Sequence, residues 1–176
     1  MKLIRLHSKK YPGLFTLVDD EDYDRLNQYQ WGISTGSNKM QYACRRFTNP
    51  LTKKRVIILM HREILGITDR KIHTDHINHI TLNNCKWNIR SCTPSQNLRN
   101  QKPAKNNTSG YKGVTYFKDY AHRLNPWGAT CTLDGKLYNI GTFPTREAAA
   151  RAYDKVVTEK YGEYALTNKA LGLLKD

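Results

Sequence analysis

Short apolar segments separated by polar turns run through the first part of the chain, and their spacing predicts small strands rather than long helices. Residues 14–18 predict one strand, and the acid-rich segment after them favours a short helix from Asp22, because acids stabilise helix N-termini. Residues 31–33 and 41–47 predict a hairpin across a turn rich in Ser, Gly and Asn. The apolar run at 55–60 predicts a further strand, followed by a helical turn.

The next segment predicts a hairpin followed by a helix. Residues 72–79 and 87–92 predict two short strands around an Asn-rich turn. The sequence Thr-Pro-Ser-Gln at 93–96 is a strong helix start, because Thr can cap, Pro suits the first helical position and Gln completes a capping box. We therefore expect a strand–strand–helix unit whose helix ends near residue 101.

The last third of the chain predicts a second, smaller sheet. Residues 111–117, 128–133 and 136–143 have strand-like patterns. The Asp-Gly pair at 134–135 is a strong signal for a two-residue hairpin turn.

A helix is expected to follow this sheet. Thr145 can cap a helix over residues 146–161, and Gly162 can end it. Its apolar face comprises Ala149, Ala152, Tyr153, Val156 and Val157. Three strands packed on one helix form about the smallest unit that can fold alone.

A polar segment at residues 101–110 predicts a linker, since it contains Pro, Gly and two lysines but no acid. Free flexibility and an extended path along a phosphate backbone both remain open for it. We therefore expect an α+β protein with two domains. Residues 1–100 would form a mixed domain whose strand–strand–helix core lies at about 60–100, and residues 111–170 would form a three-stranded antiparallel sheet packed on one helix.

The charge of the chain indicates a polyanionic partner. The 176 residues include 29 Lys and Arg against 15 Asp and Glu, which gives a net charge of +14. Residues 1–109 carry 19 basic and 8 acidic side chains, against 10 and 7 in residues 110–176. Because no basic amphipathic helix is evident, nucleic acid is favoured over an anionic membrane.

The cellular compartment can be predicted from three features that the sequence lacks: a membrane span, a signal peptide and closely paired cysteines. No run approaches the roughly 20 apolar residues of a membrane span, and the N-terminus has no apolar signal-peptide core. The four cysteines are widely spaced without a CxxC pair, which favours free thiols over disulfides or a zinc ribbon. We expect a cytoplasmic protein.

Four polar side chains suit phosphodiester hydrolysis. Asp75 can give an anionic oxygen to Mg²⁺, and Asn97 can add a carbonyl oxygen from the predicted helix. His76 suits the role of general base, because its ordinary pKa lies near neutrality. Asn88 can brace either a backbone segment or the His76 ring. Since neighbouring strand residues face opposite sides, Asp75 and His76 can share a site only at a strand end or bulge.

These residues resemble the HNH family of nucleases, whose core is the ββα-metal fold. The resemblance runs through residues 75–78, 83–84, 88–90 and 96–100. It implies that Asp75 and Asn97 bind one Mg²⁺ or Mn²⁺ per active site, that His76 activates water and that Asn88 is structural. Segments 17–23 and 60–66 also resemble the lead-in of phage and intron-borne members.

Two residues depart from the HNH pattern. His79 stands where the family usually has Gly, and Asn83 stands where it usually has Asp. Both lie in the predicted turn, so they threaten its local shape more than metal binding.

Residues 110–168 resemble a second family, the plant ethylene-response (APETALA-type) DNA-binding domain. The matching residues lie at 110–114, 127–129, 140–143, 147–154 and 162–165. The resemblance implies that the three-stranded sheet enters the major groove of duplex DNA. Because Thr132 stands where Arg is common, readout by Arg–guanine pairs should be weaker or carried by other residues.

Basic and aromatic residues along both domains are candidate DNA contacts. They are Arg45, Arg46, Arg90, Arg99, Lys102, Lys105, Lys112, Lys118, Arg123, Trp127, Lys136 and Tyr138. Arg45 and Arg46 are adjacent on a predicted strand, so one would reach phosphate while the other is solvated. Trp127 fits a core position and a DNA contact equally well.

Other aromatic residues have plainer interpretations. Trp31 and Trp87 are expected in the core rather than stacked on bases. His61 fits a structural histidine at a strand–helix junction at least as well as a phosphate contact. A zinc site formed by the histidines at 73, 76 and 79 is disfavoured, since His76 would face away from the other two on a strand.

The sequence favours a site-selective, metal-dependent DNA endonuclease of the phage or intron homing type. We expect double-stranded DNA as its partner, no membrane or small-molecule substrate, and action as a monomer or a dimer assembled on DNA. The resemblance implies hydrolysis that leaves 5′-phosphate and 3′-hydroxyl ends. A non-cleaving DNA-binding regulator with a relic nuclease core is the alternative. An RNA-binding module ranks lowest, because no paired aromatic sheet motif is present.

Overall fold

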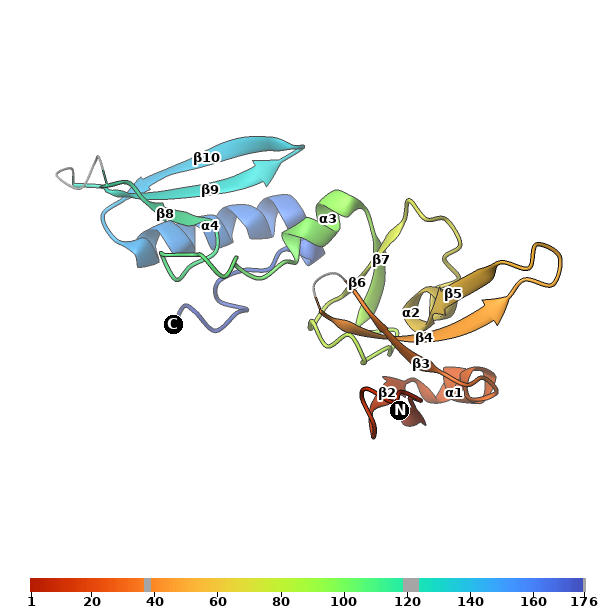
Figure 1. The fold of residues 1–176 in the computed structure, drawn as a ribbon. Helices are drawn as coiled ribbons and strands as arrows, with labels where there is room; N and C mark the ends of the chain where they lie inside the picture. Colours follow the sequence, from red (N-terminus) through yellow and green to blue (C-terminus); the bar gives the residue numbers. More distant parts are fainter. Residues whose placement is uncertain (37–38, 119–123, 176) are drawn as a thin grey trace. The chain divides into compact units, whose positions relative to one another are not determined.

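The structure is a computed structural model of the chain, and it describes all residues except 37–38, 119–123 and 176 (Figure 1). The chain forms two compact units, Met1–Pro94 and Ser95–Asp176. Both contain small antiparallel sheets and few helices, which is the α+β class expected from the sequence. Among the described residues, no helix has the length and apolar character needed to cross a membrane.

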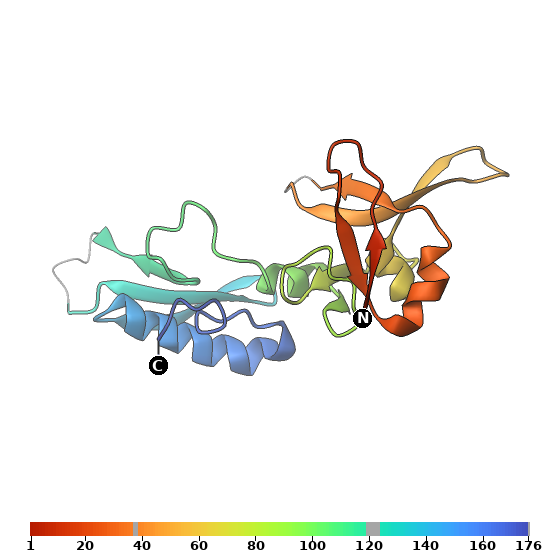
Figure 2. The ribbon, with the colours of Figure 1, turned by 90° about the horizontal axis from the view of Figure 1, so that it is seen from below.

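The first unit begins with a hairpin beside a helix (Figure 2). β1 (Lys2–Arg5) pairs antiparallel with β2 (Phe15–Val18), and α1 (Asp20–Asn27) follows. The sequence interpretation missed β1. Its inward residue Ile4 and the following Leu6 are buried while Leu3, Arg5 and His7 are exposed, and this period-two pattern is too short to stand out in the sequence.

A three-stranded sheet forms the middle of this unit. Its strands are β3 (Gly32–Thr35), β4 (Gln41–Thr48) and β5 (Arg55–Leu59), in that order, and α2 (Met60–Ile64) follows directly. The core of the unit comprises Ile4, Leu6, Val18, Leu26, Trp31, Ala43 and Met60. Trp31 is thus buried as expected.

A two-stranded sheet closes the first unit. β6 (His73–His76) pairs antiparallel with β7 (Ile89–Cys92), which places Asp75 opposite Arg90. The loop between these strands is attached to β2, because the Leu17 N–H donates to Leu82 O at 2.9 Å and the Asn84 N–H donates to Leu17 O at 2.8 Å. The loop that follows β6 is therefore fixed by the N-terminal hairpin.

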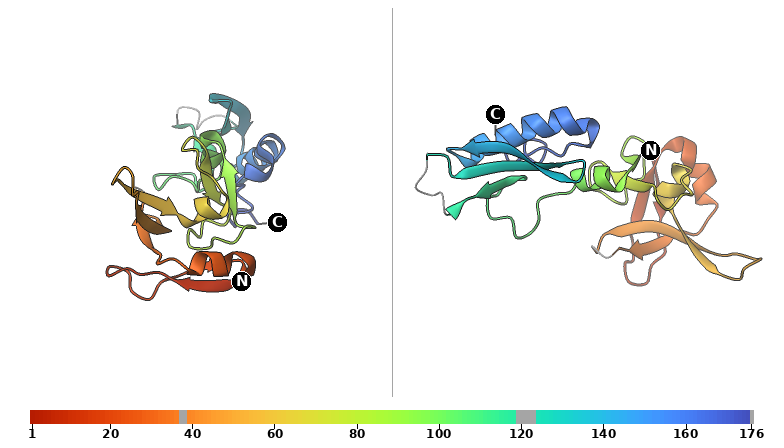
Figure 3. Two further views of the ribbon diagram at one scale, coloured as in Figure 1. Left: turned by 90° about the vertical axis from the view of Figure 1, so that its right-hand side faces the viewer. Right: turned by 90° about the horizontal axis from the view of Figure 1, so that it is seen from above.

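The second unit is a sheet covered on one face by a helix (Figure 3). Its elements are α3 (Pro94–Arg99), β8 (Val114–Tyr116), β9 (Trp127–Leu133), β10 (Lys136–Phe143), α4 (Arg146–Tyr161) and the 3-10 helix η2 (Gly162–Tyr164). The antiparallel order is β10-β9-β8, as the predicted sheet-plus-helix arrangement requires. Thr145 caps α4 by accepting a hydrogen bond from the Ala148 N–H at 3.1 Å.

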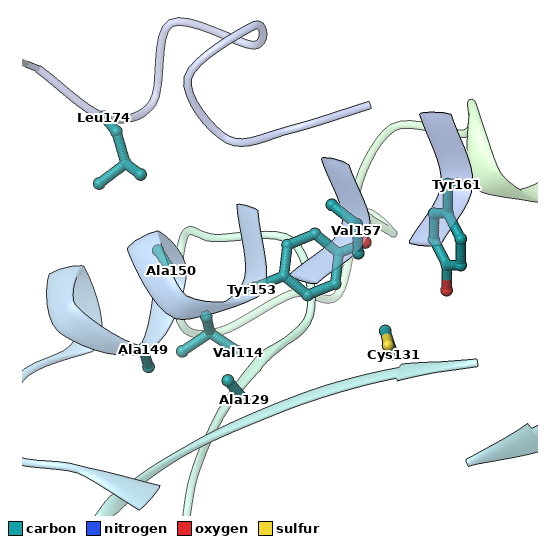
Figure 4. Close-up of a cluster of buried hydrophobic side chains, with 9 residues drawn as sticks. All are labelled: Val114, Ala129, Cys131, Ala149, Ala150, Tyr153, Val157, Tyr161 and Leu174. Atoms are coloured by element: carbon teal, nitrogen blue, oxygen red, sulfur yellow. The ribbon is translucent and has the colours of Figure 1, made fainter. Parts of the chain in front are cut away.

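Small and aromatic side chains pack between this sheet and α4 (Figure 4). The buried set comprises Val114, Ala129, Cys131, Ala149, Ala150, Tyr153, Val157, Tyr161 and Leu174. Gly113 lets the backbone pass under the Tyr153 ring, since a Cβ at this position would lie 2.1 Å from ring carbons. Gly113 also has a φ of +74°, which favours glycine.

Candidate active site

Two buried histidines from different elements meet in the first unit. His76 is the last residue of β6 and is 6% exposed, while His61 lies in α2 and is 3% exposed. Their ring centroids are 5.1 Å apart and the ring planes make an angle of 83°. Tyr42 of β4 completes the group, with its centroid 5.6 Å from that of His61 and 6.0 Å from that of His76.

A chain of hydrogen bonds fixes the His76 ring from behind. His76 Nε2 lies 3.1 Å from Asn84 Oδ1. The Asn84 Nδ2 donates to Thr16 Oγ1 at 2.7 Å, and the Thr16 hydroxyl donates to Leu82 O at 2.8 Å. His76, Asn84 and Thr16 are all buried, so water competes little for these bonds.

Burial keeps both histidines neutral. It is the main cause that lowers the pKa of His61 to about 3, with the charges of His76 and Arg62 acting in the same direction. Burial also lowers the pKa of His76, although the bond to Asn84 and the charge of Asp75 oppose it. A neutral imidazole at pH 7 can accept a proton, as a general base must.

Asp75 is buried beside His76 and is held by Arg90. The Arg90 Nε and Nη2 donate to Asp75 Oδ2 at 3.0 Å and 2.7 Å. The Arg90 side chain is 12% exposed, so its position favours orienting the carboxylate over reaching a DNA phosphate. A carboxylate fixed by a hydrogen-bonding partner is the usual form of a metal ligand, and its oxygen chemistry suits Mg²⁺.

Asn88 braces the loop between β6 and β7. Its Nδ2 donates to Asn83 O at 2.8 Å, and its Oδ1 accepts from the Asn78 N–H at 3.0 Å. Of the two roles considered from the sequence, these contacts match support of a backbone segment. The residue that binds the His76 ring is Asn84, which the sequence interpretation includes in the Asn-rich turn and in the HNH resemblance but gives no role at the site.

The turn keeps the shape expected of a glycine at position 79. His79 has a φ of +63°, a left-handed conformation that glycine adopts without strain. Asn83 forms a parallel bridge with Leu17. The two departures from the HNH pattern therefore leave a well-defined turn.

Asn97 lies on α3 and belongs to the second unit. This helix is attached to its own unit, because the Lys112 ammonium donates to Arg99 O at 2.6 Å and the Arg99 guanidinium lies 4.4 Å from the centre of the Tyr161 ring. The role of Asn97 as a metal ligand stays a prediction from the sequence pattern.

The candidate DNA contacts of the first unit differ in their surroundings. Arg45 is paired with Glu63, with Nε 2.9 Å from Oε2, and its guanidinium also lies over the Tyr29 ring. Arg46 is exposed, and which of the two adjacent arginines reaches phosphate stays a prediction. The expectation that Trp87 lies in the core is wrong. Trp87 is 58% exposed, because it lies on the surface in the loop that precedes β7.

The candidate contacts of the second unit also divide by exposure. Lys112 and Arg99 are partly buried, and burial lowers the pKa of Lys112 to about 8. Trp127 is half-buried and packs against Tyr116, with ring centroids 4.8 Å apart. The exposed candidates are Lys102, Lys105, Lys118, Lys136 and Tyr138. Arg123 lies outside the described residues.

The fold and site define a basic α+β protein with a buried, neutral histidine pair beside an arginine-held aspartate. The chain is 33% identical over 100 residues to protein 3.8 of Escherichia phage T7, which covers 57% of this chain and 78% of the T7 protein. The chain belongs to the same family as this T7 protein.

A second relative carries a more informative name. The chain is 29% identical over 158 residues to a protein of Acanthamoeba polyphaga mimivirus named uncharacterized HNH endonuclease L560, which covers 89% of this chain and 76% of the relative. This similarity supports an HNH-type family. No family model matches the chain, and no solved structure matches it.

Proposed function

We propose that this protein is a metal-dependent, site-selective DNA endonuclease of the phage or intron homing type. The observation that carries the proposal is the buried neutral His76 at the end of β6, directly beside Asp75. His76 is the last residue of β6, which meets the condition that the two neighbouring residues can share a site only at a strand end. The HNH endonuclease name of the mimivirus relative supports a nucleic acid substrate.

In this mechanism His76 removes the proton from the attacking water. Its neutral ring is available at pH 7 because burial disfavours the imidazolium. Asp75 and Asn97 would hold the metal ion, Mg²⁺ or Mn²⁺, one per active site, with Arg90 orienting the Asp75 carboxylate. When bound, the ion would neutralise charge on the phosphate and on the leaving oxygen. Asn88 keeps the loop after His76 in shape.

The second unit would dock on duplex DNA through its three-stranded sheet, as its APETALA-type resemblance implies. Its strands expose Lys136 and Tyr138 on β10, and Lys118 follows β8. Exposed cations and aromatic rings on a small sheet suit contacts to phosphates and base edges. We expect the protein to act in the cytoplasm, as a monomer or as a dimer assembled on DNA.

A cleavage assay on supercoiled plasmid tests the proposal. Protein with Mg²⁺ should nick or linearise the plasmid, and EDTA should stop the reaction because the metal is removed. The ends should carry 5′-phosphate and 3′-hydroxyl groups. Tight plasmid binding without any strand breakage, in Mg²⁺ and in Mn²⁺, would instead support the non-cleaving regulator.

A further inference from the structure

The buried amide of Asn84 has a fixed orientation, and that orientation selects a proton position on His76. We propose that Asn84 is a positioning residue that keeps neutral His76 in the form protonated at Nε2, so that Nδ1 is the nitrogen that takes the proton from water. The role of Nδ1 rests on the proposed function. The proton position rests on the hydrogen bonds alone and can be measured without any cleavage.

The orientation is set at Thr16. A hydroxyl has one hydrogen, and the two acceptors beside that of Thr16 are Leu82 O at 2.8 Å and the weaker Met60 sulfur at 3.9 Å, so the hydrogen is donated to Leu82 O. Thr16 Oγ1 can then only accept a hydrogen bond from the Asn84 side chain, whose nearest atom lies 2.7 Å away. The atom facing Thr16 is therefore the amide nitrogen Nδ2.

Met60 supports the same orientation. Its sulfur lies 3.7 Å from Asn84 Nδ2, where a weak acceptor can receive the second amide hydrogen. If the amide were reversed, its oxygen would face the sulfur, and the Thr16 hydroxyl would have to leave Leu82 O. A hydrogen bond lost in a buried site leaves a polar atom unsatisfied, so the reversed amide is disfavoured.

The remaining amide atom, Oδ1, faces His76 Nε2 at 3.1 Å. An amide oxygen can only accept, so Nε2 of the neutral ring must carry the hydrogen. The lone pair then lies on Nδ1. Because Asn84 is almost fully buried, it acts on the reaction through His76 and not by contact with substrate.

Nitrogen NMR on the full-length protein tests the proton position directly. Protonated and unprotonated ring nitrogens have well-separated ¹⁵N shifts, and the His76 signals can be assigned by their loss in His76→Gln. At a pH where His76 is neutral, we expect one form, with hydrogen on Nε2. Hydrogen on Nδ1, or an averaged mixture of the two forms, would overturn the proposal.

Two substitutions at Thr16 form a matched pair for this test. Thr16→Ser keeps the hydroxyl and should preserve the Nε2–H form. Thr16→Val keeps the shape but removes the acceptor for Nδ2, so the amide can reverse and the Nδ1–H form should appear. Identical His76 spectra for Val and Ser would show that Thr16 does not set the orientation. Asn84→Leu, which removes the amide itself, gives an independent check that should also release the preference.

Cleavage by the same variants links the proton position to catalysis. Thr16→Val and Asn84→Leu should lower the single-turnover rate roughly 10- to 100-fold with unchanged DNA affinity, while Thr16→Ser stays near the wild-type rate. A lost Nε2–H preference together with a wild-type rate would refute the catalytic role of Nδ1. A wild-type protein that shows the Nε2–H form but never cuts DNA would refute the nuclease proposal and leave the positioning by Asn84 intact.

Discussion

At the scale of single residues, the centre of the first unit is polar yet shielded from water. His61, His76, Asp75 and Asn84 are all buried, and such groups are tolerated inside a protein only when neighbours satisfy them or burial keeps them neutral. Asp75 has Arg90 and Asn84 has Thr16, whereas the Nδ1 of His61 has no hydrogen-bond partner within the described part of the chain. His61 is therefore the residue whose charge state should affect stability most.

Acid should unfold the first unit partly through His61. The pKa of this residue is about 3 when folded and near 6.5 when unfolded, so above pH 6.5 it adds no pH dependence. Below that value the unfolded chain binds a proton that the folded chain excludes, and stability falls as the pH drops towards about 3. His61→Phe should reduce this slope by up to about 1.4 kcal/mol per pH unit.

Denaturant unfolding of the wild type and His61→Phe between about pH 6 and about pH 4 measures this slope. His73→Phe is a matched control, because His73 is exposed and its loss should leave the slope unchanged. If His61→Phe and the wild type lose stability in parallel, His61 does not bear the charge penalty that its burial implies.

Arg90 should act through the Asp75 carboxylate and not through DNA. Arg90→Gln removes the guanidinium that donates two charge-assisted hydrogen bonds to Asp75 Oδ2, and we expect roughly a 10- to 100-fold loss of cleavage with little change in DNA affinity. Single-turnover cleavage and a binding titration separate the two effects. If the variant binds DNA several-fold more weakly but cuts at the normal rate when it is saturated with DNA, Arg90 contacts DNA and does not act through Asp75.

At the scale of elements, local sequence signals were sufficient for most of the fold. The hairpin of β6 and β7, the start of α3 at Pro94 and the Thr145 cap of α4 each depend on residues close together in the chain. The turn between β9 and β10 follows its Asp-Gly pair, since Asp134 and Gly135 both have positive φ.

The features that the sequence interpretation missed depend on distant contacts. Asn84 is hydrogen-bonded to Thr16, which lies 68 residues earlier in the chain, and no local sequence pattern predicts that contact. β1 is only four residues long, and its hydrogen bonds to β2, farther along the chain, are what make it a strand. Trp87 was placed in the core from its residue type, although its position after a loop leaves the ring on the surface.

Alanine substitutions at two glycines of the second unit allow the cost of backbone strain to be measured apart from the cost of a steric clash. Gly110 and Gly113 have φ values of +80° and +74°, but a Cβ would meet nothing within 4 Å at Gly110 and the Tyr153 ring at Gly113. Gly110→Ala should cost about 1 kcal/mol from the left-handed backbone alone. Gly113→Ala should cost about 2 to 4 kcal/mol, because Tyr153 must also move.

Thermal or denaturant unfolding of the two alanine variants gives both values. Equal losses of stability would mean that the Tyr153 ring does not pack over the backbone at Gly113, which would contradict the packing between the sheet and α4.

At the scale of the whole molecule, the chain has a net charge of +14 and two compact units. In the proposed mechanism the two units have different functions. The first unit would supply His76 and Asp75 for the reaction, and the sheet of the second unit would supply affinity. Electrostatic contacts to phosphates release counterions, so the salt dependence of binding reports how many cations touch the DNA.

Replacing sheet-side lysines should therefore reduce the salt dependence of DNA binding. The double variant Lys118→Gln/Lys136→Gln should bind more weakly, with a slope of log affinity against log salt that is shallower by about 0.9 for each phosphate that the protein no longer neutralises. Lys155→Gln/Lys160→Gln is the matched control, since both lysines are exposed on α4. A larger decrease in affinity for the α4 pair than for the sheet pair would mean that the helix side, and not the sheet, faces DNA.

The most direct test of the nuclease assignment is the single-turnover cleavage rate of His76→Ala on plasmid DNA with Mg²⁺, measured beside DNA affinity. We expect the variant to bind DNA about as tightly as the wild type and to lose cleavage by roughly 100-fold or more, because the general base is gone. Cleavage by His76→Ala at the wild-type rate would contradict the account, because His76 would then not be the base.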